Sequence, residues 1–230
     1  MFFLTYSESN REKNWLRLKS LFPKARRVHG IKGLALAHQI CAKLSNSSFF
    51  FVVNGDNEVC PSFNFSTPEK ILKPAVYCWR SLNPVNGLIY GFGGIKLFPK
   101  KAFSANSSFV DISTSLKLNY KVVPEVASIT RFNGSALSAW RGAFRECVKL
   151  SSECINNQKT GETRERLSIW CEKGAERMFG EYVLLGAKQG KEYGQTNKEN
   201  PKALSKINDF NWLKQFFKTK AQNKIQTGSV

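Results

Sequence analysis

The first 55 residues alternate between short apolar runs and segments with helical spacing. Apolar runs at residues 2–6 and 49–53 predict two strands, and a further short strand is predicted at Ala25–Val28. Between them, apolar residues recur every three or four positions, first after the capping residues Ser7–Asn10 up to Pro23, and then over Ile31–Leu44. This spacing predicts two helices. The resulting β-α-β-α-β order is typical of a parallel sheet covered by helices.

The third apolar run, Phe49–Val53, leads directly into the turn Asn54-Gly55-Asp56-Asn57. A short aromatic and β-branched run of this kind predicts a strand that is buried on both faces. In open α/β sheets, ligands bind beyond the carboxyl ends of the strands, where this turn and the first-strand residues Thr5 and Tyr6 fall. Its carboxylate and amide oxygens suit a hard divalent cation that bridges phosphates. An ordinary solvated Asn-Gly turn is the alternative.

Beyond residue 60 the alternation breaks. Further strands are predicted at residues 75–80, 109–113 and 120–129, and helices at residues 135–150 and 208–217. We expect a surface loop over 151–166 that leads into a helix through residues 170–178. A Gly-rich segment at 90–99 carries glycines at 91, 93 and 94 before Lys96, so a ligand could approach its backbone closely; a bulged strand is the alternative.

Charge is the outstanding feature of the composition. The 230 residues include 35 Lys and Arg against 17 Asp and Glu, a net charge of +18. A chain this basic commonly binds a polyanion, although a Lys-rich surface also confers solubility. In the predicted helix 135–150, Arg141, Arg145 and Lys149 form one ridge at i, i+4 and i+8, downstream of Arg131 and Asn133. We read the ridge as an anion-binding surface, with a solvated helix face as the alternative.

The cysteines and the hydropathy pattern indicate the compartment. Six cysteines show no CxxC pair and no Cys/His spacing suited to zinc. The apolar start Met1–Leu4 is too short for a signal peptide, and no apolar run approaches the ~20 residues of a membrane span. We therefore expect a soluble intracellular protein without zinc and without a membrane partner.

The early β-α-β-α-β half and the buried strand ending in an Asp turn resemble the GT-A glycosyltransferases. In that class a DxD motif follows the corresponding strand, and Asn54-Gly55-Asp56 is similar to a DxD whose first Asp is Asn. Several later segments resemble the viral TET-associated glycosyltransferases, and together they extend the resemblance over most of residues 2–217. These segments are 77–88, 90–97, 110–115, 131–133, 139–146 and 208–210.

The resemblance implies an α/β fold: a GT-A-like, Rossmann-type mixed sheet flanked by helices, with a helical C-terminal part. It implies one domain over residues 1–217, with a nucleotide-binding half at 1–60, an acceptor-side half at 75–150 and a disordered basic tail at 218–230. It also implies a bacteriophage enzyme, cytoplasmic in the infected host, that transfers a sugar from a nucleotide-sugar to 5-hydroxymethylcytosine or 5-hydroxymethyluracil in DNA.

The expected site has three parts. The donor, a UDP-sugar, and a divalent cation (Mn²⁺ or Mg²⁺) held by Asp56 and Asn54 would occupy the strand ends. The donor-binding candidates are Thr5, Tyr6, Ser7, Lys32, Asn54, Gly55, Asp56, Gly93, Gly94 and Lys96. The DNA-binding candidates are Trp79, Arg80, Asn83, Arg131, Asn133, Arg141 and Arg145, with Trp79 equally suited to the core.

A base must deprotonate the acceptor hydroxyl if the reaction inverts the anomeric centre. Asp111 is the first candidate and Glu125 the second. His29 and His38 are weaker candidates, and the apolar helix face around His38 predicts a core histidine. Two alternatives stay open: a GT-A enzyme with a glycan or protein acceptor, and a non-catalytic nucleic-acid-binding protein.

Overall fold

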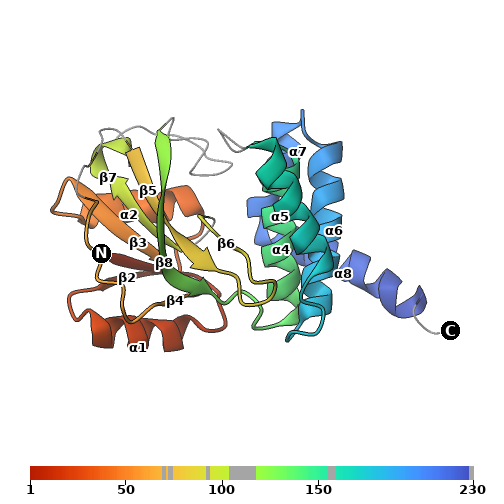
Figure 1. Cartoon of the computed structure of the whole chain (residues 1–230), viewed down its shortest axis with the longest axis horizontal. Coiled ribbons are helices and arrows are strands. Elements are labelled where there is room, and N and C mark those ends of the chain that lie inside the picture. The colour runs from red at the N-terminus through yellow and green to blue at the C-terminus, as the bar shows by residue number, and fades with distance from the viewer. Residues whose placement is uncertain (69–70, 72–74, 92–93, 104–117, 155–158, 228–230) are drawn as a thin grey trace. The chain divides into compact units, whose positions relative to one another are not determined.

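A computed structural model describes residues 1–68, 71, 75–91, 94–103, 118–154 and 159–227 (Figure 1). Its contacts divide the chain into two compact units, Met1–Phe132 and Asn133–Val230. The first unit holds the sheet, and the described part of the second is helical. The boundary falls inside the segment 75–150 that we expected to form an acceptor-side half. The predicted strand at 109–113 lies outside the described residues.

The first unit begins with the predicted β-α-β-α-β order. Its elements are β1 (Phe2–Thr5), α1 (Arg11–Leu21), β2 (Arg26–His29), α2 (Leu34–Leu44) and β3 (Phe49–Asn54). Strand β1 lies between β2 and β3 and is parallel to both, with Leu4 opposite Val28 on one side and Asn54 on the other. The sequence prediction is confirmed for this half of the sheet.

The remaining strands make the sheet mixed and curled. They are β4 (Asn57–Val59), β5 (Ala75–Leu82), β6 (Ile89–Tyr90), β7 (Ile95–Pro99) and β8 (Asn119–Thr130). In the described residues the strand order is β2-β1-β3-β7-β5-β8-β4, with β6 beside β5. Strand β7 is antiparallel to β3 and β5, whereas β8 is parallel to β5. The expected α/β class with a mixed, helix-flanked sheet is therefore confirmed.

Both faces of the sheet are covered by helices. Phe50 and Val52 of β3 pack toward α2, and Phe51 and Val53 pack in the cluster that contains Leu18 of α1. All four side chains are buried, as predicted for a central strand. Figure 1 shows α1 and α2 on opposite sides of the strands. Burial on both faces fixes β3, and with it the turn that follows.

The second unit is a set of helices. They are α4 (Ala136–Ser151), α5 (Thr160–Glu172), α6 (Gly180–Thr196), α7 (Pro201–Ser205) and α8 (Phe210–Thr227). Helix α4, predicted at 135–150, starts with a capping box in which Ser135 and Ser138 exchange backbone-to-side-chain hydrogen bonds. None of the helices in the described ranges is long and apolar enough to cross a membrane.

Three features of this unit differ from the prediction. Residues 160–166, expected in a loop, form the first half of α5, which ends at Glu172 rather than continuing to Met178. Helix α6 was not predicted at all, because four glycines reduce its intrinsic helix propensity. Helix α8 runs to Thr227, whereas we expected disorder from residue 218.

The glycines of α6 have a packing role against α4. A Cβ atom at Gly186 would lie 2.3 Å from the Trp140 carbonyl oxygen, and one at Gly190 would lie 2.4 Å from that of Phe144. At Gly194 it would lie 2.1 Å from Ser151 Oγ. The two helix backbones therefore touch, and only glycine fits at these positions.

This contact yields a stability prediction. We expect Gly190→Ala to lower the free energy of unfolding by roughly 1–3 kcal/mol, because overpacking outweighs the better helix propensity of alanine. Urea unfolding followed by circular dichroism measures it. The control is Gly161→Ala in α5, whose Cβ would meet nothing within 4 Å. Equal stability of the two variants would contradict the close packing of α4 and α6.

Candidate active site

Five strands of the first unit end at one edge of the sheet, which we call the carboxyl edge. Strands β1, β2, β3, β5 and β8 run in the same direction. Their last residues are Thr5, His29, Asn54, Leu82 and Thr130. The prediction that Thr5, Tyr6 and Asn54–Asp56 share one edge is confirmed. This is the edge at which α/β sheets bind ligands.

The turn between β3 and β4 is held by backbone hydrogen bonds from three elements. Asn54 N donates to Gly94 O at 2.9 Å, and Arg131 N donates to Asp56 O at 2.8 Å. The buried Asn14 of α1 donates from Nδ2 to Gly55 O at 3.0 Å. The turn is therefore fixed to its surroundings and is not the solvated turn of the alternative interpretation.

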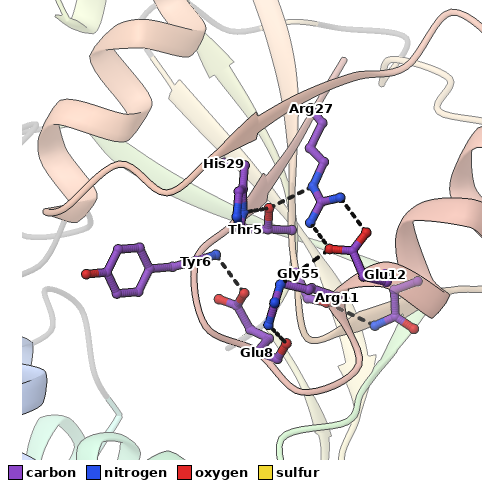
Figure 2. Close-up of polar contacts among 9 residues, drawn as sticks. Thr5, Tyr6, Glu8, Arg11, Glu12, Arg27, His29 and Gly55 are labelled. Atoms are coloured by element: carbon purple, nitrogen blue, oxygen red, sulfur yellow. Dashed lines mark hydrogen bonds and ion pairs between the residues drawn. The ribbon is translucent and has the colours of Figure 1, made fainter.

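A polar chain fixes the end of β1 (Figure 2). Thr5 is 2% exposed, and its Oγ1 accepts a hydrogen bond from Arg27 Nε at 3.0 Å and lies 2.9 Å from His29 Nδ1. Arg27 in turn forms a two-pronged contact with Glu12 of α1, at 2.7 and 2.6 Å. These hydrogen bonds lower the pKa of Glu12. The hydroxyl of Thr5 thus has a fixed position beside the imidazole of His29.

Glu8 lies against the turn, and no pattern in the sequence marks it as a site residue. Its Oε2 accepts a hydrogen bond from Tyr6 N at 2.7 Å. A Cβ atom at Gly55 would lie 2.8 Å from the same Oε2 and 2.9 Å from Thr5 Cγ2, so a larger residue there would displace the carboxylate of Glu8. Figure 2 shows Glu8 below Thr5, between Tyr6 and Arg11. The carboxylate of Glu8 therefore adds negative charge beside Gly55, in the turn that also carries Asp56.

The loop after β5 contributes Asn83. This residue is fully buried, and its Oδ1 accepts a hydrogen bond from Val85 N at 2.9 Å. Its Nδ2 is buried without a hydrogen-bond partner in the described structure. A buried N–H donor without a partner costs about 1–3 kcal/mol. Such a donor at the carboxyl edge fits a group that awaits a ligand or a water molecule.

The other predicted donor residues lie at or near the carboxyl edge. Ser7 and Lys32 are exposed, in the loops that follow β1 and β2. Lys96 is the second residue of β7 and lies opposite Val52. Gly94 pairs with Asn54 as described above, and Gly93 lies outside the described residues.

Of the two carboxylates predicted to act as the base, the structure describes only Glu125. Asp111 lies outside the described residues. Glu125 is exposed in a bulge of β8, where it and Pro124 are the two extra residues between the partners of Trp79 and Arg80. It is five positions from the end of the strand at Thr130, away from the carboxyl edge. His38 is a buried core residue, as predicted, with its ring 5.2 Å from that of Phe98.

Trp79 and Arg80 of β5, both candidates for DNA contact, lie on opposite faces of the strand. Trp79 is 2% exposed and packs with Phe51 and Phe63 in the core, with ring centroids 5.3 and 5.6 Å apart. Arg80 is exposed. The core alternative is thus the one observed for Trp79.

The cations predicted to contact DNA in the second unit have partners within that unit. Arg145 donates to Ile207 O at 2.8 Å and to Asn208 Oδ1 at 3.0 Å. The guanidinium groups of Arg141 and Arg145 lie 4.4 and 5.6 Å from the ring centroid of Phe210. Two of the segments that carry the resemblance, 139–146 and 208–210, therefore contact each other.

Lys149 and Asn133 are engaged in the same way. Lys149 forms an ion pair with the buried Glu146 at 2.9 Å. Asn133 donates from Nδ2 to Met178 O at 3.0 Å. The ridge at 141, 145 and 149 thus packs onto its own unit, a role that neither interpretation of the sequence anticipated.

The residues at the turn fit a cation that arrives with a diphosphate. The described residues contain no group of three or more His, Cys, Asp or Glu side chains that could hold a metal ion. Asp56 is half-buried, and its Oδ1 accepts a hydrogen bond from Asn57 Nδ2 at 2.7 Å. One or two carboxylates completed by phosphate oxygens and water are the usual protein share of a Mg²⁺ site.

Comparison with known protein families, with curated proteins and with solved structures finds no match to this chain. The class of the protein therefore rests on its mixed α/β sheet and on the polar groups of the carboxyl edge.

Glu58 of β4 ties the turn to its neighbours and yields a pH prediction. It forms an ion pair with Arg17 of α1 at 3.0 Å and a short contact with Arg131. The hydrogen bond from Arg131 holds the pKa of Glu58 below its ordinary value. A depressed carboxylate pKa stabilises the fold above the ordinary pKa, and this contribution is lost as the pH falls through the folded-state value.

We therefore expect Glu58→Gln to lower the free energy of unfolding by about 1 kcal/mol at pH 7 and to flatten its decline below about pH 4.5. Urea unfolding at a series of pH values measures both curves, which should converge in acid. The control is Glu162→Gln, which removes an exposed carboxylate on α5. Parallel curves for the wild type and Glu58→Gln at all pH values would refute this role.

Proposed function

We propose that the chain is a GT-A type glycosyltransferase. Its reaction transfers a sugar from a nucleotide-sugar, here a UDP-sugar, to the hydroxyl of 5-hydroxymethylcytosine or 5-hydroxymethyluracil in DNA. The observation that carries the proposal is the turn Asn54–Asp56, which follows a doubly buried strand. It is fixed at the carboxyl edge because it accepts hydrogen bonds from Asn14 and Arg131 and donates one to the carbonyl oxygen of Gly94. A non-catalytic binding module has no need of an Asp turn held in this way.

On the donor side, the positions of the residues suggest separate roles in binding the nucleobase, the two phosphates and a metal ion. Tyr6 is 40% exposed at the end of β1 and offers an aromatic face to a nucleobase. Lys32 and Lys96 supply positive charge for the two phosphates. Asp56, with Asn54 beside it, would hold a Mg²⁺ or Mn²⁺ ion. Such an ion neutralises the charge that develops on the diphosphate leaving group.

On the acceptor side, the support is charge. Residues 1–132 carry 18 Lys and Arg against seven Asp and Glu, a net charge of +11 in the unit that contains the carboxyl edge. Such a surface favours a polyanionic acceptor.

The acceptor hydroxyl loses its proton as it attacks the anomeric carbon, if the reaction inverts. Glu125 lies five positions from the end of β8, which weakens its case as the base. Asp111 therefore stays our first candidate. The base takes the proton from the hydroxymethyl oxygen, the new C–O bond forms, and the bond to the diphosphate breaks.

The decisive experiment measures transfer directly. Purified protein is incubated with Mn²⁺, a panel of nucleotide-sugars and DNA that contains either 5-hydroxymethylcytosine or 5-hydroxymethyluracil. The DNA is then digested, and the masses of its nucleosides are measured by mass spectrometry. We expect a product heavier by one sugar residue, and a fall of at least about 100-fold in kcat/KM for Asp56→Ala. Glu162→Gln, in the second unit, is the control and should retain full activity.

Other outcomes would select the alternatives. Transfer to a glycan or peptide without transfer to hydroxymethylated DNA would favour a GT-A enzyme with a different acceptor. DNA binding with a steep salt dependence, together with no consumption or binding of any nucleotide-sugar, would refute the proposal in favour of a binding protein.

A further inference from the structure

Asn57, the first residue of β4, lies between Asp56 and a group of three hydroxyls. It is 1% exposed. Its Oδ1 accepts hydrogen bonds from Thr130 Oγ1 at 2.9 Å and from Ser128 Oγ at 3.0 Å, and Ser81 Oγ lies 3.4 Å away. Its Nδ2 donates to Asp56 Oδ1 at 2.7 Å. The side-chain amide thus connects two strands of the sheet to the carboxylate of the turn.

The hydroxyls determine which way the amide of Asn57 faces. Ser128 and Thr130 can each donate a proton, and an amide oxygen has two lone pairs to accept them. Ser81 Oγ has its own acceptor, the Ser128 carbonyl oxygen at 2.9 Å. In the reverse orientation, the amide oxygen would face the carboxylate of Asp56, and the two acceptors would repel each other. The amide nitrogen therefore faces Asp56.

The space for this amide is provided by Gly94. A Cβ atom at Gly94 would lie 1.7 Å from Asn57 Cγ and 2.0 Å from its Oδ1. Gly94 also accepts the hydrogen bond of Asn54 N at 2.9 Å. Gly94 therefore has two roles. Its carbonyl oxygen accepts a hydrogen bond from Asn54 at the start of the turn, and its missing side chain leaves room for the Asn57 amide that bonds to Asp56.

We propose that Asn57 is a positioning residue that sets the direction of the Asp56 carboxylate toward the donor diphosphate and its cation. This inference rests on the function proposed above and assigns Asn57 a part in it. The amide occupies Oδ1 of Asp56 with a charge-assisted hydrogen bond and thereby fixes the rotation of the carboxylate. Groups that orient a metal-binding residue typically change metal affinity 10–100-fold when they are altered.

The contact itself is tested without any ligand. In a ¹H–¹⁵N spectrum, we expect the Asn57 side-chain NH₂ signal to move upfield in Asp56→Ala, because its charged acceptor is lost. Glu162→Gln, which removes an exposed carboxylate on α5, is the control and should leave that signal in place. An unmoved signal in Asp56→Ala would overturn the inference, whatever the protein transfers.

The functional part is tested by the affinity for Mn²⁺ and UDP together, measured by calorimetry. We expect Asn57→Ser to weaken the binding of Mn²⁺ with UDP about 10–100-fold and to leave the binding of UDP alone unchanged. Thr130→Val is a milder variant that removes one hydroxyl and retains both Asn57 and Asp56; it should weaken binding less. Ser45→Ala, which removes a buried hydroxyl near the start of β3, is the matched control and should leave the affinity unchanged.

A double-mutant cycle separates positioning from general loss of stability. In the Asp56→Ala background, Asn57→Ser should cause no further loss of affinity, because its effect acts through that carboxylate. An equal loss in both backgrounds would overturn the inference in favour of a purely structural role. If the wild-type protein binds no nucleotide with Mn²⁺, the proposed function fails, while the NMR result still decides whether Asn57 binds Asp56.

Discussion

The closure of the curled sheet is the constraint on which the candidate site depends. Strands β3 and β4 are separated by only Gly55 and Asp56, yet β4 pairs with β8 at the far end of the strand order. The sheet must therefore bend until the end of β3 meets the end of β8. Where the two ends meet, the buried amide of Asn57 lies against the backbone of Gly94, and Arg131 N, just after β8, donates a hydrogen bond to Asp56 O at the carboxyl edge.

Local pattern was enough to predict the first half of the fold. The apolar run Phe49–Val53, the helix spacing around it and the polar turn that follows depend only on neighbouring residues, and the structure has each of them where the pattern indicated. The parallel order of β1, β2 and β3 follows from the short helical connections. For the same reason the shared edge of Thr5 and Asp56 could be predicted before any coordinates.

The remaining features depend on contacts between distant segments. In the sequence, Glu8 cannot be told from any other acidic residue in a loop. Only the fold places its carboxylate against Gly55. Helix α6 has poor intrinsic propensity and is stable because its glycines fit the backbone of α4. The cations Arg141 and Arg145 formed a plausible DNA-binding ridge in the sequence, whereas in the structure they stack on Phe210. None of these contacts produces a periodic pattern of apolar residues in the sequence from which it could be predicted.

The bonds that reach Asn57 from Ser128 and Thr130 span 71 and 73 residues of chain. Contacts of such long range form late in folding, because the entropy of closing the intervening loop is lost before the contacts contribute any stabilising free energy. The residues of the turn and of β1 all precede residue 60, so a fragment that ends there contains Asp56 and Asn57 but lacks the strand whose hydroxyls hold the Asn57 amide. The first three strands and their helices are consequently not a module that can be separated, inherited or exchanged on its own, because the amide of Asn57 acquires these partners only when β8 is in place.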